Sequence, residues 1–380
     1  MHGTIDSMFC VEWRQLSELA PLAEEWRALA ARALEPNVFY EPSFALAAAP
    51  VFGRDVGAGL VWSREARRRL LGFFPARIER HRWGVVLPAL VGWTHAYAPL
   101  GTPLIDREAA DEIIAAWLDH LATDSHLPKL LLLPYLPRGA VARTITAAVT
   151  RRRGWITSYA HHRRALLEPG NDRTGYLGRS IASKKRKELR RQRRRLRDAS
   201  DVLRITTRGP IETAAALDDF FALEAAGWKG RAGTAAYADL QTREFFTSAI
   251  SALVAEGKAR IDRLVVGPKP VAAIITLRSG ATAWCWKTSY DETFSRASPG
   301  VQLLLDVTQT LLDDESIARS DSCATPDHPM IDHIWRERLT LSDQIISVGA
   351  GYPFVCACLI EGSRRISVAL AKSLHRLTHR

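Results

Sequence analysis

The stretch from residue 260 to residue 312 constrains the fold more than any other part of the chain. Three runs of β-branched and apolar residues, at 261–266, 271–277 and 281–288, are separated by turn residues. Apolar side chains then recur at helical spacing over residues 301–312. This order predicts a three-stranded meander that leads into an amphipathic helix.

The start of the predicted helix has the features of a phosphate site. Ser298 fits the N-cap and Pro299 fits the first helical position. A helix start exposes free backbone N–H groups and the positive end of the helix dipole, and Gly300 lets a ligand approach the backbone closely. An ordinary strand-to-helix junction has the same sequence features, so both interpretations stay open at this point.

The loop before the helix carries a family resemblance. It reads Tyr290-Asp291-x-x-Phe294-x-x-x-Ser298-Pro299-Gly300-x-x-Leu303-Leu304 and resembles the signature of the CelD/BcsL-type acetyltransferases, a branch of the GNAT superfamily. Members are similar to FemAB-like transferases and are often tied to bacterial cellulose or other exopolysaccharide production. Residues 184–197, 224–230 and 321–335 extend the resemblance. The superfamily's usual pyrophosphate loop, Gln/Arg-x-x-Gly-x-Gly/Ala, is replaced here by Arg296-x-x-x-Gly300.

The resemblance implies an α/β fold of tandem GNAT-like domains, in which mixed central sheets are flanked by helices. Alternating strand and helix patterns in the first half fit this fold class. We expect a degenerate N-terminal GNAT-like domain at residues 1–165 and a catalytic GNAT domain at 166–350. A terminal strand and a basic amphipathic helix follow at 351–380. Further patterns predict a parallel strand at 317–323, a helix at 330–339, and strands at 345–348 and 355–359.

The resemblance also implies acetyl-CoA or another acyl-CoA as co-substrate, with no metal. Because proline has no N–H, the backbone donors to the pyrophosphate begin at Gly300. The predicted cofactor-binding residues are Arg296, Ser298, Gly300, Val301 and Gln302. The predicted substrate-binding residues are Trp228, Lys229 and Asp291. As alternatives, Trp228 caps the core and Lys229 is simply solvated.

Acyl transfer needs an oriented acceptor, a donor to the developing oxyanion and a group that removes the acceptor's proton. Backbone amides of residues 285–287 are candidate oxyanion donors. His328 is the candidate base because of its ordinary pKa, with Asp321 or Asp327 to orient it. The resemblance assigns Tyr290 the return of a proton to the leaving thiolate. A structural His328 is the plain alternative, and Cys323 is expected to be inert in its apolar run.

The chain carries a net charge of +11, which favours an anionic partner. Residues 184–197 are densely basic, and Ile181, Leu189 and Leu196 add a narrow apolar stripe at helical spacing. This pattern predicts a surface helix that is either a solvated charged face or a surface for phosphates, an anionic acceptor or lipid headgroups. The basic helix at 363–380 either packs on the body or makes peripheral contact with a membrane.

Five cysteines, an odd and small number, indicate reduced thiols and a cytoplasmic protein. The first residues lack the basic-then-apolar pattern expected of a signal peptide, and the apolar runs are shorter than a spanning helix needs. The leading interpretation is an acyl-CoA-dependent N- or O-acyltransferase acting on a saccharide or polysaccharide precursor. One alternative is a FemAB-like transferase that uses aminoacyl-tRNA. Another is a non-catalytic adaptor that binds anionic polymers or membranes.

Overall fold

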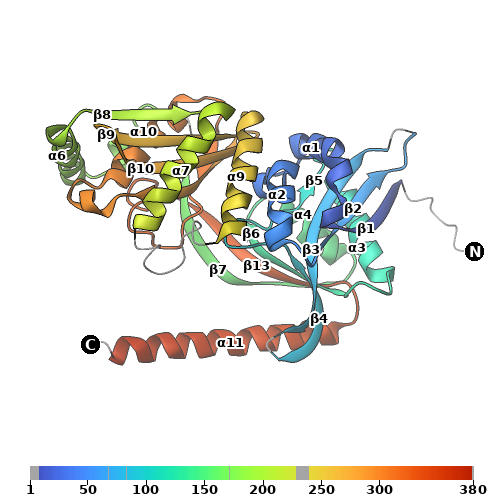
Figure 1. The fold of residues 1–380 in the computed structure, drawn as a ribbon. Helices are drawn as coiled ribbons and strands as arrows, with labels where there is room; N and C mark the ends of the chain where they lie inside the picture. Colours follow the sequence, from blue (N-terminus) through green and yellow to red (C-terminus); the bar gives the residue numbers. More distant parts are fainter. Residues whose placement is uncertain (1–7, 67, 83, 171, 228–238, 379–380) are drawn as a thin grey trace, which may run out of the picture. The chain divides into compact units, whose positions relative to one another are not determined.

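The computed structural model describes residues 8–66, 68–82, 84–170, 172–227 and 239–378 (Figure 1). The chain forms two compact units. The first unit comprises Met1–Glu35, Asp55–His161 and Leu341–Arg380, and the second comprises Pro36–Arg54 and His162–Thr340. The first unit thus includes the C-terminal segment Leu341–Arg380, and the second includes Pro36–Arg54 from within the predicted N-terminal domain. The division at residues 165 and 350 stays a prediction.

The first unit is built on a mixed sheet. Its strand order is β1-β2-β3-β4-β6-β13, with β5 beside β3, and only β4 and β6 are parallel among its described pairs. The strands are β1 (Phe9–Gln15), β2 (Val56–Ser63), β3 (Leu70–Arg82), β4 (Val85–Gly92), β5 (Leu104–Ile105), β6 (Leu130–Pro137) and β13 (Glu337–Ser347). The helices are η1 (Leu16–Glu18), η2 (Ala20–Leu22), α1 (Ala23–Arg32), α3 (Ala110–Thr123), α4 (Ala140–Arg151) and α11 (Gly351–Thr378).

Helices cover both faces of this sheet. Ile113 and Trp117 of α3 and Ile145 of α4 belong to one buried cluster with residues of β2, β3, β4 and β6. The first half of α11 packs through Ala357 into another cluster. The predicted strand at 355–359 is therefore wrong, because the apolar residues of this stretch recur at helical spacing and cover the sheet as a helix. Farther along α11, Ile366 is exposed.

The second unit contains the predicted meander. Its strand order is β7-β12-β11-β10-β9-β8, and among its described pairs only β11 and β12 run parallel. The strands are β7 (Trp155–Leu167), β8 (Val202–Thr207), β9 (Ala259–Val266), β10 (Lys269–Ser279), β11 (Thr282–Tyr290) and β12 (Arg319–Asp321). The helices are η3 (Val38–Tyr40), α2 (Pro42–Phe52), α5 (Tyr176–Ser180), α6 (Ser183–Ala199), α7 (Pro210–Ala226), α9 (Leu240–Ala255), η5 (Glu292–Ala297) and α10 (Pro299–Asp313).

Alternation along β11 separates two layers of core. Trp286 packs against Phe44 of α2 and Phe246 of α9, with ring centroids 5.6 and 4.7 Å away. Cys285 points to the other face and is buried in a cluster with Leu303 of α10 and Leu189 of α6. Since neighbouring residues of a strand face opposite sides, this short apolar run anchors helices on both faces of the sheet.

The region after β12 differs in part from the sequence prediction. The parallel strand predicted at 317–323 is confirmed as the shorter β12, and the strand at 345–348 is the end of the longer β13. The helix predicted at 330–339 is wrong: turns occupy residues 329–334, and β13 begins at Glu337. Ile331, Ile334 and Trp335 are nonetheless buried. Their spacing therefore predicted correctly that they are buried, although the backbone is not helical.

Candidate active site

The candidate site lies where the two parallel strands of the second unit separate. β11 and β12 pair over three residues only, from Thr282↔Arg319 to Trp284↔Asp321. β12 then ends, whereas β11 continues to Tyr290. On its other side, β11 has a bulge at Trp286 in its pairing with β10. The backbone of residues 285–290 therefore runs past the end of β12, at the sheet edge where parallel strands of α/β folds bind ligands.

The connection from β11 to α10 is held by Asp291. Its carboxylate accepts hydrogen bonds from the N–H (2.8 Å) and hydroxyl (2.6 Å) of Thr293 and lies 2.6 Å from Nζ of Lys269. Partial burial acts to raise the pKa of Asp291, but the Lys269 and Thr293 hydrogen bonds outweigh it and hold that pKa below its usual value. Asp291 thus caps η5, and its predicted role in substrate binding stays a prediction.

The first turn of α10 follows a left-handed residue. Ser298 has φ 49° and occupies the N-cap position, but its side chain makes no capping hydrogen bond to the helix. Pro299 is the first helical residue, as predicted. The N–H of Gln302 donates to the carbonyl of Ser298 (3.1 Å). The first-turn amides of Gly300 and Val301 come before that bond, so helix geometry gives them no acceptor within α10.

Gly300 faces the ring of Tyr290. A Cβ on Gly300 would lie 3.0 Å from Cδ1 of Tyr290, closer than such atoms normally pack. The glycine therefore lets the helix start approach the tyrosine at the end of β11. The sequence predicts that Gly300 gives a ligand access to the backbone; in the structure the Tyr290 ring occupies the space where a side chain at residue 300 would lie.

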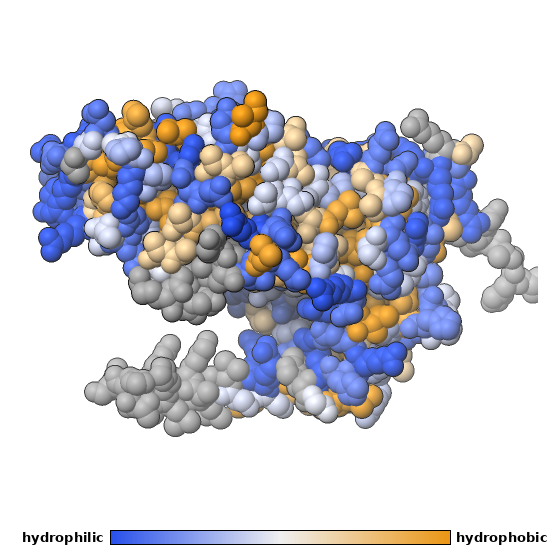
Figure 2. Space-filling model, in the orientation of Figure 1, coloured by the Kyte–Doolittle hydropathy of each residue, from blue (hydrophilic) through white to orange (hydrophobic). Residues whose placement is uncertain are grey.

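Basic helix α6 lies beside the start of α10. Nε2 of Gln302, a buried side chain, donates to the carbonyl of Leu189 (3.0 Å), and Nη1 of Arg195 donates to the carbonyl of Arg296 (3.0 Å). Arg193 forms an ion pair with Asp306 of α10 at 3.1 Å. The predicted apolar stripe is confirmed, since Ile181, Leu189 and Leu196 are buried. The remaining basic residues of α6 form part of a hydrophilic surface at the left of Figure 2.

A small cavity next to Tyr290 adds residues that the sequence analysis did not select. Glu224 of α7, Ser289 and Glu292 line it together with Tyr290. Ser289 is 4% exposed, and its hydroxyl has no hydrogen-bond partner among the described residues. Glu224 lies in the 224–230 stretch that carried the resemblance, which was the available signal for it. Trp228 and Lys229, the other predicted substrate-binding residues, lie outside the described residues.

The other predicted catalytic residues lie at the end of β12 and in the loop that follows it. Asp321 is buried, accepts from Nη2 of the buried Arg164 (2.5 Å) and caps the N–H of Cys323 (3.0 Å). Nδ1 of His328 accepts from the N–H of Met330 (3.3 Å). Burial, with a contribution from the Asp321 carboxylate, raises the pKa of the Cys323 thiol well above its usual value, which disfavours a nucleophilic thiolate.

Left-handed backbone marks both loops at this edge. Ser298, before α10, and Cys323 and Asp327, after β12, all have positive φ. Residues other than glycine hold this conformation at a cost of about 1–3 kcal/mol, and such residues gather at functional sites. The backbone conformation of these residues thus also makes the two loops candidates for contact with a ligand.

Comparison with known families decides the class of this region. Residues 183–327 match the model of the acetyltransferase (GNAT) domain. This match lies within the second unit. The matched stretch begins with α6 and ends in the loop after β12, so it contains the separated strands and the start of α10. No curated protein matches the chain at a significant level.

Solved structures show the same fold around the GNAT domain. FemX has a TM-score of 0.56 at 8% identity, over 85% of this chain and 95% of its own. The C-terminal domain of a protein assigned as a lysylphosphatidylglycerol synthetase, from Agrobacterium fabrum, has a TM-score of 0.54 at 9% identity, over 86% and 91%. At these identities the likeness concerns the fold alone. It confirms the predicted mixed α/β class with sheets flanked by helices.

Proposed function

We propose that this chain transfers an acyl group from acyl-CoA, with acetyl-CoA as the leading donor, to a saccharide or an exopolysaccharide precursor. The observation that carries the proposal is the start of α10, which follows β11 at the point where its parallel partner has ended, inside the stretch that matches a GNAT domain. The acceptor class rests on the CelD/BcsL resemblance. A cytoplasmic location fits the five free cysteines.

In this proposal the pyrophosphate of coenzyme A binds the amides of Gly300 and Val301. Arg296 is exposed and contributes positive charge, and Ser298 shapes the turn before the helix. Gln302 supports the site indirectly by joining α10 to α6. The thioester carbonyl lies along β11, where the backbone N–H groups of residues 285–287 donate to the oxyanion.

Val301 provides a test of the phosphate position. A carboxylate in the first turn interacts favourably with the helix dipole but repels a phosphate. Val301→Asp should therefore melt no lower than Val301→Asn while binding coenzyme A at least about tenfold more weakly. Val301→Asn is the matched control, because it loses the same partly buried valine without adding charge. Calorimetry that finds equal affinity in the Asp and Asn variants places the pyrophosphate elsewhere.

Tyr290 is proposed to protonate the leaving thiolate, with His328 as the acceptor's base and Asp321 as a structural support. Tyr290→Phe keeps the ring against Gly300 and removes only the hydroxyl. We expect turnover to fall about a hundredfold while affinity for coenzyme A is retained. Full turnover in Tyr290→Phe, measured as thiol release, would assign that proton to another group. Asp321 is unsuited to such a test, because its removal breaks a buried ion pair with Arg164, which costs about 3–5 kcal/mol.

A transferase that uses aminoacyl-tRNA is the second candidate. The observation in its favour is the cationic outer face of α6 beside the start of α10, since such a surface suits a phosphate backbone. Contact of the basic C-terminal helix with an anionic membrane is compatible with either candidate.

A further inference from the structure

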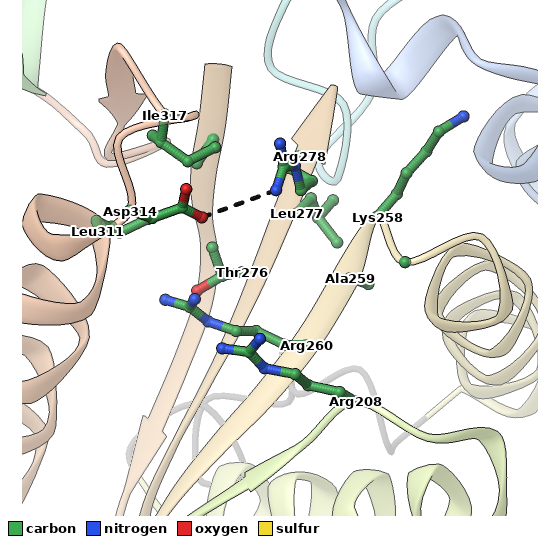
Figure 3. Close-up of a pocket in the computed structure, with 12 residues that line it drawn as sticks. Arg208, Lys258, Ala259, Arg260, Thr276, Leu277, Arg278, Leu311, Asp314 and Ile317 are labelled. Atoms are coloured by element: carbon green, nitrogen blue, oxygen red, sulfur yellow. Dashed lines mark ion pairs between the residues drawn. The ribbon is translucent and has the colours of Figure 1, made fainter. Parts of the chain in front are cut away.

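A basic pocket lies in the second unit at the end of the sheet opposite Tyr290. It is bounded by the start of β9, the end of β10, the start of β11 and the last turn of α10 (Figure 3). Its volume is about 200 Å³. One water needs about 10–15 Å³ of such a space, so a polyatomic ligand fits. Because α10 begins at the other end of the sheet, this pocket is separate from the proposed coenzyme A site.

Arg260, on β9, is only partly neutralised. Its Nε lies 3.0 Å from a carboxylate oxygen of the fully buried Asp262. The same carboxylate also receives Arg204 (2.7 Å) and the hydroxyl of Thr206 (2.6 Å). One negative charge therefore serves two guanidinium groups, which leaves positive charge at the pocket.

Two buried polar groups that line the pocket lack partners. Nη2 of Arg260 and the hydroxyl of Thr276 have no hydrogen-bond partner among the described residues. Thr276 is 5% exposed, and Figure 3 shows its hydroxyl next to the Arg260 guanidinium. A buried polar group without a partner destabilises the folded chain, so a ligand that accepts hydrogen bonds from both groups would remove this cost.

Two more arginines converge on the same space. Arg208 is exposed at the pocket rim, with its guanidinium beside that of Arg260 in Figure 3. Burial lowers the pKa of Arg260, and Arg208 and Arg204 add to this effect against Asp262. Arg278 lies opposite, 3.2 Å from the hydroxyl of Ser316.

Negative charge at the pocket is limited. Asp314 forms a loose pair with Arg278 at 3.8 Å. A hydrogen bond from Ser316, aided by Arg278 and Arg260, lowers the pKa of Asp314, so this carboxylate is ionised near neutral pH. Lys258 also borders the pocket, but its amine is directed to Glu41 (2.5 Å) and Glu256 (2.8 Å) and points away in Figure 3. The pocket lining therefore has more positive than negative charge, with Arg208, Arg260 and Arg278 against Asp314.

We propose that this pocket binds a small ligand through a phosphate or diphosphate group. Guanidinium groups recognise phosphate oxygens through paired hydrogen bonds, and three of them border one cavity here. A base-stacking nucleic acid is a poor match, because the lining contains no aromatic residue among those described. The site would serve as a regulatory or accessory anion site of the GNAT domain.

The test is calorimetric titration of the full chain with inorganic pyrophosphate, in the presence of saturating coenzyme A to occupy the other phosphate site. Arg208→Gln and Arg278→Gln alter partly exposed side chains, and each should weaken binding by about tenfold. Arg243→Gln, which removes the same charge from α9, should bind as the parent does. If coenzyme A itself fails to bind, the proposed function fails. The pyrophosphate titration of the parent and of the Arg208 and Arg278 variants still measures binding to this pocket.

Thr276→Val separates a ligand site from a structural cluster. The change replaces a buried hydroxyl without a partner by a methyl group, so stability should be kept or increased while pyrophosphate binding weakens. Vesicles of phosphatidylcholine with phosphatidic acid provide the second arm. Binding to vesicles alone, lost in Arg208→Gln and Arg278→Gln, assigns the phosphate to a lipid. The proposal is overturned if neither probe binds, or if these variants bind as well as the parent.

Discussion

At the scale of single residues, the structure changes the meaning of several motif positions. Tyr290 and Gly300 stand ten residues apart in the same signature and lie against each other in the structure. Asp291 holds the loop between them through Thr293 and Lys269. A signature read from sequence therefore includes residues that shape the backbone, beside those proposed to contact ligands.

Asp291→Asn tests which kind of residue this carboxylate is. A capping role predicts a loss of about 1 kcal/mol at pH 7, since Lys269 is largely exposed and the pair is screened. Because the folded-state pKa is lowered, this contribution is present above the unfolded pKa of about 3.9 and disappears as the pH falls through the folded value. Urea unfolding at pH 7 and in acid should show this convergence, with the exposed Glu244→Gln as control. A raised acceptor KM with unchanged stability would make Asp291 a substrate ligand.

At the scale of elements, α6 has two kinds of arginine. Arg193 and Arg195 dock it on α10 and η5, while Arg190, Arg194 and Arg197 are exposed. Replacing the three exposed residues by Gln should leave the melting temperature and acyl-CoA turnover nearly unchanged if this face is only solvated. Replacing Arg193 and Arg195 is the control that should lower stability.

The same triple variant distinguishes the two candidate functions. If the chain uses aminoacyl-tRNA, the variant should lose tRNA binding, and the parent's affinity should fall steeply with salt. Loss of turnover at unchanged coenzyme A affinity would instead make α6 part of the acceptor site. Filter binding at two salt concentrations and a thiol-release assay give these readouts.

At the scale of the whole molecule, several of the positively charged side chains stabilise the fold. Arg173 alone donates to the carbonyls of Leu311, Leu312, Asp314 and Ile317 around the end of α10. Arg204 and Arg260 share Asp262 inside the second unit. The net charge of +11 is therefore a weaker guide to partners than the few sites where positive charge stays uncompensated. In the helices that the structure describes, no segment is long and apolar enough to cross a membrane.

The sequence alone determined the meander, helix α10 with Pro299 at its start, the docked face of α6 and the mixed α/β class. These depend on local spacing of apolar residues and on turn chemistry, which a single stretch of chain contains. The helix predicted at 330–339 and the strand predicted at 355–359 are wrong. The spacing of apolar residues indicates which residues are buried, but several backbone conformations can bury the same residues. Only the tertiary structure decided that Gly300 faces Tyr290, that Arg164 neutralises Asp321, and that Arg208, Arg260 and Arg278 border one pocket. Each of these depends on contacts between residues far apart in the chain, and local pattern carries no information about such pairs.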